Sequence, residues 1–150
     1  MLYREKDYPL PEGWQLPGWF SHAGIYYKYV GTGDTLDFKN HLVIESVPNG
    51  GVVMHTFDYF FYLTNFYDSR TKNPTYQQRS TIIQTATGKM GLPYAFFEGY
   101  KGPNTFRCDG LGEYAYEAAG VDILADSSWS ELTPDAQRSA MVLARGDAPQ

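Results

Sequence analysis

Apolar residues gather in three short segments of the first half of the chain, and turn residues separate these segments. Residues 21–30 and 42–47 are rich in aromatic and β-branched side chains, and residues 52–57 follow a Pro-Asn-Gly-Gly turn. Aromatic and β-branched residues favour strands, and a turn of this kind joins two neighbouring antiparallel strands. The pattern therefore predicts a meander of three antiparallel strands.

Helical spacing of apolar residues appears in the second half. Residues 75–89 place Ile82 and Ala86 on one face and directly follow a proline. Residues 132–144 begin with Thr133, whose hydroxyl can cap a helix, and with a proline, which is favoured at the first helical position. We expect one helix over each of these two segments.

A third helix is expected over residues 104–120. Asn104 or Thr105 can accept a hydrogen bond from its first turn, and Gly120 can end it in a left-handed conformation. Its apolar face consists of Cys108, Leu111, Ala115, Ala118 and Ala119. Together with the strands, these helices predict an α+β fold, a small antiparallel sheet packed against helices, in one domain over residues 1–150.

Three stretches show no period and are expected to be irregular. Residues 1–19 are rich in Pro and Trp, residues 58–74 are aromatic and then polar, and residues 91–103 combine Gly, Pro and aromatic side chains. Such compositions are typical of loops that run over the surface. We interpret the aromatic stretch as one wall of a cleft.

Cys108 is the only cysteine of the chain and falls at the expected start of the third helix. There the unpaired N–H groups and the helix dipole favour thiolate over thiol, which predicts a lowered pKa and a nucleophile. A lone cysteine on an apolar helix face is more commonly a small buried hydrophobic residue. The segment by itself leaves both interpretations open.

Composition excludes several classes of protein. A single cysteine cannot form an internal disulfide, and a net charge of −5 argues against a nucleic-acid-binding surface. No apolar run approaches the roughly 18 residues of a membrane span, so no integral membrane segment is expected. The first eight residues are too charged for a secretory signal peptide.

Residues 106–121 resemble the cysteine motif of the NlpC/P60 superfamily of papain-like hydrolases, in which aromatic-Asp-Cys-Ser-Gly-Leu precedes a Tyr-Ala-aromatic helix. Upstream, the Gly-Leu-Pro-Tyr segment that ends at Tyr94 resembles the Gly-x-x-Tyr segment of the same superfamily. Arg107 and Asp109 depart from the family pattern, because Asp and Ser commonly flank the cysteine there. This departure leaves the subfamily and the substrate open.

The chain offers His22, His41 and His55 as bases for a cysteine nucleophile, and any histidine taken alone is more commonly structural. The His-Ala-Gly-Ile-Tyr segment that ends at Tyr26 resembles the His-Val-Gly-Ile-Tyr motif of the superfamily. In this chain the histidine motif precedes the cysteine by more than eighty residues. That order resembles the circularly permuted branch, which includes the YiiX-like and lecithin:retinol acyltransferase-like groups.

The resemblance implies a papain-like fold and a role for four residues. Cys108 would be the nucleophile, His22 the base, Glu45 the carboxylate that orients the imidazole, and Tyr94 a hydroxyl donor to the oxyanion. Asp37, Asn40 and His41 are alternative orienting groups. We expect sulfur, ring and carboxylate to converge in one groove.

The activity implied by the resemblance is hydrolysis of an amide bond through a thioester intermediate. Peptidoglycan stem peptides are the leading substrate, and an antibacterial effector with an immunity or inhibitor protein as partner is one setting for such an enzyme. Lipid acyl hydrolysis or transfer, and a non-catalytic binding module, are the alternatives. We expect no cofactor and no metal, because the histidines lack the spacing of a zinc helix and the cysteine lacks a CxxC partner. The sequence does not indicate a cellular compartment.

Overall fold

The computed structural model describes residues 1–4, 22–33, 35–62, 67–97, 101–124 and 132–143. Within them, six strands form one sheet in the order β4-β3-β2-β1-β5-β6, and all neighbouring strands are antiparallel. The strands are β1 Leu2–Arg4, β2 His22–Tyr29, β3 His41–Val47, β4 Gly51–Thr56, β5 Tyr67–Thr71 and β6 Val142–Leu143. The helices are η1 Phe38–Asn40, α1 Phe57–Phe60, α2 Tyr76–Thr87, α3 Cys108–Ala118 and α4 Pro134–Ala140. The predicted α+β class and the predicted meander β2-β3-β4 are confirmed.

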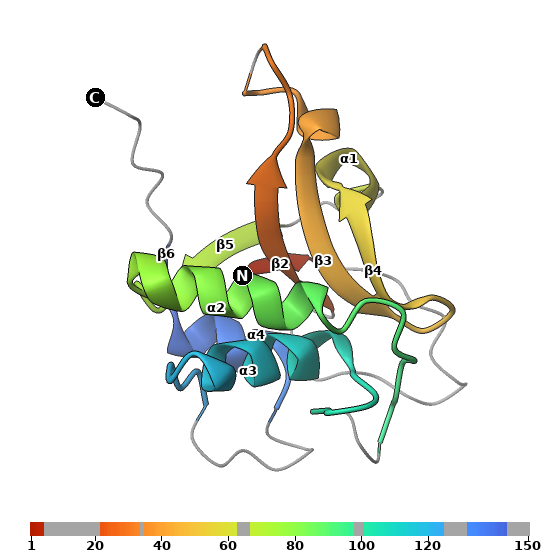
Figure 1. Ribbon diagram of the computed structural model, residues 1–150, viewed down its shortest axis with the longest axis vertical. Helices are drawn as coiled ribbons and strands as arrows, with labels where there is room; N and C mark the ends of the chain where they lie inside the picture. Colours follow the sequence, from red (N-terminus) through yellow and green to blue (C-terminus); the bar gives the residue numbers. More distant parts are fainter. Residues whose placement is uncertain (5–21, 34, 63–66, 98–100, 125–131, 144–150) are drawn as a thin grey trace.

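The sheet separates two apolar clusters. Helices α2 and α3 pack against each other and against β2, and α3 also contacts β3 (Figure 1). Strand residues of the larger cluster alternate with those of the smaller one, so the two clusters occupy opposite faces of the sheet. The larger cluster, on the face of α2 and α3, includes Tyr3, Ala23, Ile25, Ile44, Leu111 and Ala115. The smaller cluster, on the face of α1, consists of Leu2, Val43 and Phe60 with Phe57 and Phe61 against it.

The helix boundaries agree with several of the expected signals. Thr75 caps α2 through a reciprocal capping box with Gln78, and Thr133 caps α4 by accepting from the Ala136 N–H at 3.1 Å. Gly120 follows α3 with a φ of +69°, as the left-handed helix end requires.

Four expectations about the elements are wrong. Helix α3 begins at Cys108, and Arg107 occupies the N-cap position without a side-chain cap, so neither Asn104 nor Thr105 has that role. Helix α4 ends at Ala140 because the chain then pairs with β5 as strand β6. The stretch 1–19 contains β1, and the stretch 58–74 contains most of α1 and all of β5. Residues 5–21 lie outside the described residues.

Candidate active site

Glu45 is a buried carboxylate in the middle of the sheet that contacts side chains of three other strands. It lies in β3 between β2 and β4 and is fully buried. Gly24 pairs with it on β2, and a Cβ on Gly24 would lie 2.6 Å from Val43 and 2.7 Å from the ring of Phe60. A side chain at position 24 would displace one of these groups. The glycine of the histidine motif therefore admits the Phe60 ring, which closes the site from the side of α1.

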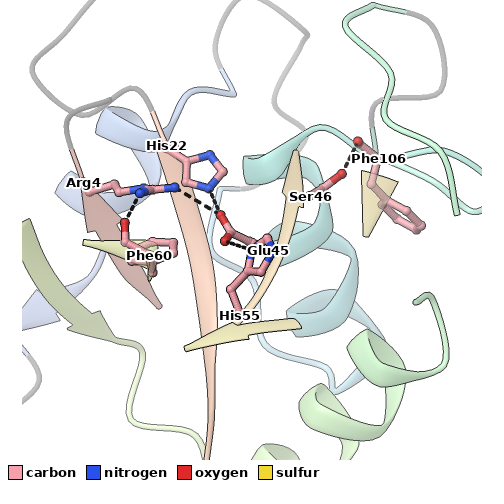
Figure 2. Close-up of polar contacts among 7 residues, drawn as sticks. All are labelled: Arg4, His22, Glu45, Ser46, His55, Phe60 and Phe106. Carbon is pink, nitrogen blue, oxygen red and sulfur yellow. Dashed lines mark hydrogen bonds and ion pairs between the residues drawn. The ribbon is translucent and has the colours of Figure 1, made fainter. Parts of the chain in front are cut away.

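Three donors from three different strands converge on the Glu45 carboxylate (Figure 2). His22 of β2 bonds Oε2 through Nε2, and Arg4 of β1 reaches the same oxygen with Nη2 at 3.4 Å. His55 of β4 bonds the other oxygen, Oε1, through Nδ1 at 2.7 Å. Arg4 also donates to the backbone carbonyl of Phe60. The carboxylate is thus held at both oxygens, by side chains from both sides of its own strand.

These donors determine the charge of the group. Burial opposes ionisation of Glu45, but hydrogen bonds from His22 and His55, together with the positive charge of Arg4, hold its pKa well below its usual range. An ionised carboxylate only accepts hydrogen bonds, so we assign the ring protons that face it to Nε2 of His22 and to Nδ1 of His55. In neutral His22 the remaining nitrogen, Nδ1, is then the basic one.

His22 is the first residue of β2 and is fully buried, with its ring 5.5 Å from that of Phe60. Alternation along β2 places this ring on the face of Phe60, away from the face that α3 covers through Ala23. The backbone N–H of Ala23, the residue after His22, favours the thiolate of Cys108 and acts to lower the pKa of its thiol. Helix α3, which begins at Cys108, packs on the Ala23 face, so the convergence of sulfur, ring and carboxylate in one groove stays a prediction.

Cys108 differs from expectation in its acidity. It is the first residue of α3, but it is 4% exposed, and burial followed by the negative charge of Asp109 raises the pKa of its thiol to about 12. The N–H groups of Ala23 and Asp109 and the positive charge of Arg107 oppose this shift without reversing it. The expectation that the start of the helix lowers the pKa of the Cys108 thiol is therefore wrong, because burial of the thiol has the larger effect. Thiolate formation at neutral pH then requires a base that takes the proton directly.

The segment before Cys108 is fixed to the sheet. The Ser46 hydroxyl on β3 donates to the carbonyl of Phe106 at 2.8 Å, and both residues are fully buried. The N–H of Phe106 donates to the carbonyl of Pro93 at 3.1 Å, which brings the backbone of Tyr94 beside Phe106. Tyr94 is half-buried, and its ring packs on Phe96 at 4.8 Å. The position of its hydroxyl relative to the oxyanion stays a prediction.

Arg107 and Asp109, which depart from the family motif, pair with each other. The Nε of Arg107 lies 2.7 Å from Oδ1 of Asp109, and the same oxygen accepts from the Gly110 N–H at 2.8 Å. Arg107 also donates to the carbonyl of Leu132. Both charged side chains are buried, so their pairing compensates two charges that would otherwise destabilise the start of α3.

Sequence reasoning missed two of the three groups around Glu45. His55 carried a signal, because the hairpin after β3 pairs it with Val43, two residues from Glu45 and on the same face. Arg4 carried none, since it lies in a stretch without a period. The alternative orienting groups do not reach Glu45: His41 bonds the Thr35 carbonyl at 2.6 Å, at the opposite end of β3.

The part of the chain that the structure describes contains one group of three carboxylates that lie close together. The carboxylates of Glu113, Glu117 and Asp122 lie close together, but Glu113 already accepts from the Leu124 N–H and from Gln137. An acidic cluster of this kind commonly stays without an ion. Among the helices described, none combines the length and the hydrophobicity of a membrane span.

Comparison with known proteins agrees with this arrangement of elements. Searches among curated proteins and among solved structures found no match. Residues 9–144 match the family described as permuted papain-like amidase enzyme, YaeF/YiiX, C92 family. This match covers more than half of the chain, so the chain belongs to the C92 family of permuted papain-like amidases and is a cysteine peptidase or amidase.

Proposed function

We propose that the chain hydrolyses an amide bond of peptidoglycan stem peptides with Cys108 as nucleophile, His22 as base and Glu45 as the orienting carboxylate. The observation that carries the proposal is the buried hydrogen bond between His22 and Glu45. The residue after His22, Ala23, favours the Cys108 thiolate through its backbone N–H. Support for the substrate comes from the likeness of both motifs to the NlpC/P60 hydrolases of the cell wall.

The first chemical step forms a tetrahedral intermediate on Cys108. The Cys108 thiol gives its proton to Nδ1 of His22 while its sulfur bonds the acyl carbon, and the carbonyl electrons move onto oxygen. The charge that develops on His22 faces the ionised Glu45, which stabilises the imidazolium. We assign the oxyanion to the Cys108 N–H, which has no partner within the helix, and to the Tyr94 hydroxyl.

The thioester forms when this intermediate collapses, and its hydrolysis then regenerates the thiol. In the collapse, the carbonyl reforms and the C–N bond breaks as His22 passes its proton to the leaving amine. Water then attacks the thioester and gives a proton to His22, the C–S bond breaks, and the proton returns to sulfur. In this scheme the raised pKa of Cys108 keeps the resting nucleophile neutral, so the proton passes to His22 as the sulfur attacks, and no thiolate is present beforehand.

A second candidate, acyl hydrolysis of lipids, is favoured by one observation. Large apolar side chains near η1 and α1 are exposed, with Leu36 79%, Phe38 43% and Tyr59 53% exposed. Such a group of side chains suits an acyl chain as well as a protein surface.

The cell-wall proposal also includes export as an antibacterial effector with an immunity protein as partner.

The test uses purified protein, peptidoglycan sacculi and phospholipid vesicles, with Cys108→Ala as the inactive control. New free amino groups released from sacculi by the wild type alone would support the stem-peptide substrate. Released fatty acid would support the lipid alternative. Full activity of Cys108→Ala on either substrate would refute the assignment of the nucleophile.

A further inference from the structure

His55 is a histidine that neither motif predicts, and it contacts the carboxylate at the centre of the site. Its Nδ1 lies 2.7 Å from Oε1 of Glu45, whereas His22 and Arg4 share Oε2. We propose that His55 is a positioning residue, whose Nδ1–H fixes the Glu45 carboxylate so that its second oxygen aligns the ring of His22. The inference rests on the triad proposed above.

The geometry explains why a second imidazole is needed. A carboxylate held at one oxygen alone can rotate about its terminal torsion, which is broad and soft in glutamate. The guanidinium of Arg4 reaches Oε2 at 3.4 Å, which is a long contact, and so constrains this rotation weakly. The bond from His55 approaches from the opposite neighbouring strand and holds the oxygen that His22 does not use.

The ring of His55 is itself held in place. Its centroid lies 4.0 Å from that of Tyr59 on α1, and its side chain is 27% exposed, against full burial of His22 and Glu45. His55 thus connects the buried pair to the surface beside α1. A change of α1 or of the ring of Tyr59 would be transmitted to the base of the reaction through this one hydrogen bond.

His41 provides the matched comparison. It is also a strand histidine with a stacked aromatic neighbour, since its ring lies 5.0 Å from that of Phe57. Its nitrogens contact the Thr35 carbonyl and the Tyr26 hydroxyl rather than a carboxylate. Loss of its ring should leave the orientation of His22 unchanged.

The experiment reads the ring of His22 directly. The chain has three histidines. Their ring ¹⁵N and N–H resonances can therefore be assigned in the whole protein by replacing one histidine at a time and noting which signals disappear. The resonances of His22 are compared in wild type, His55→Asn, His55→Gln, His55→Leu and His41→Leu. Asparagine keeps an N–H donor near the place of Nδ1, glutamine moves it by one bond, and leucine removes it. The rate of Cys108 alkylation by iodoacetamide and the melting temperature are measured on the same samples.

We expect His55→Asn and His41→Leu to retain the Nε2–H signals of His22, and His55→Gln and His55→Leu to shift or broaden them. Alkylation should slow about tenfold in the last two variants, as expected for loss of one hydrogen bond to a charged group. If His55→Leu does not fold, the comparison of Asn with Gln still decides. The positioning role would be overturned if the His22 signals were unchanged in His55→Gln and His55→Leu. It would also be overturned if His55→Asn changed these signals as much as the other two variants do. Neither result depends on the substrate, whereas full activity of Cys108→Ala would refute the nucleophile and leave the His55 result standing.

Discussion

Replacing Glu45 by glutamine tests whether the buried carboxylate compensates the charge of Arg4. The variant keeps the shape of the side chain and removes its charge, while Arg4 stays 1% exposed. Breaking a buried ion pair on one side costs about 3–5 kcal/mol of folding free energy, because the other charge is left uncompensated. For a chain of this length that loss corresponds to a fall in melting temperature of roughly 10 °C.

The matched control is Glu117→Gln. Glu117 also pairs with a cation, Lys101 at 3.4 Å, but its side chain is 42% exposed. Exposed pairs of this kind contribute below about 1 kcal/mol. Urea unfolding at pH 7.5, followed by circular dichroism, gives the free energy of unfolding of wild type and both variants.

A double-mutant cycle identifies the source of the cost. In an Arg4→Met background the uncompensated charge is absent, so Glu45→Gln should cost at least about 1 kcal/mol less than in the wild type. The reasoning fails if Glu45→Gln destabilises no more than Glu117→Gln, or if the costs of the two changes at positions 4 and 45 simply add.

Three further substitutions test two contacts next to the site and one ion-pair cluster on β5. Ser46→Ala removes the bond to the Phe106 carbonyl and should cost about 1–3 kcal/mol, with slower Cys108 alkylation, measured by unfolding and by mass spectrometry. Gly24→Ala places a methyl group against the Phe60 ring and should cost about 1–3 kcal/mol in the same unfolding assay, with Gly33→Ala in open space as control. Asp68 pairs with Arg70 at 2.8 Å and with Arg138 at 2.6 Å. Burial opposes ionisation of Asp68, but these two arginines lower its pKa, so its contribution to stability is present above the unfolded pKa of about 3.9 and is lost as the pH falls through the folded value. Asp68→Asn should therefore be less stable than wild type at pH 7, and the difference should shrink towards pH 2; a difference that does not vary with pH would contradict this.

The predicted elements that are confirmed are those with local signals. The Pro-Asn-Gly-Gly turn determines the register of β3 and β4, and Thr75 with Gln78 determines where α2 begins. Strands β1 and β5 lacked such signals. Strand β1 has only three residues, and β5, with the sequence Tyr-Asp-Ser-Arg-Thr, shows no alternation of apolar and polar side chains. They exist through pairing with distant strands, as Leu2 with Ser69 shows.

The candidate site divides in the same way. His22 and Glu45 were both predicted from the resemblance to a known family, and the structure joins them by a hydrogen bond. Arg4 reaches the site only because β1 pairs beside β2, a contact between segments that no local pattern predicts. The acidity of Cys108 was misjudged because helix position was considered without burial, which has the larger effect here.

The convergence of donors from β1, β2 and β4 on a side chain of β3 makes the chemistry depend on the pairing of all four strands. If β1 or β4 separates locally from its neighbour, the imidazole loses its alignment although most of the secondary structure persists. Turnover should therefore disappear at a lower temperature than the ellipticity at 222 nm, which would make catalysis a sensitive reporter of local opening in the sheet.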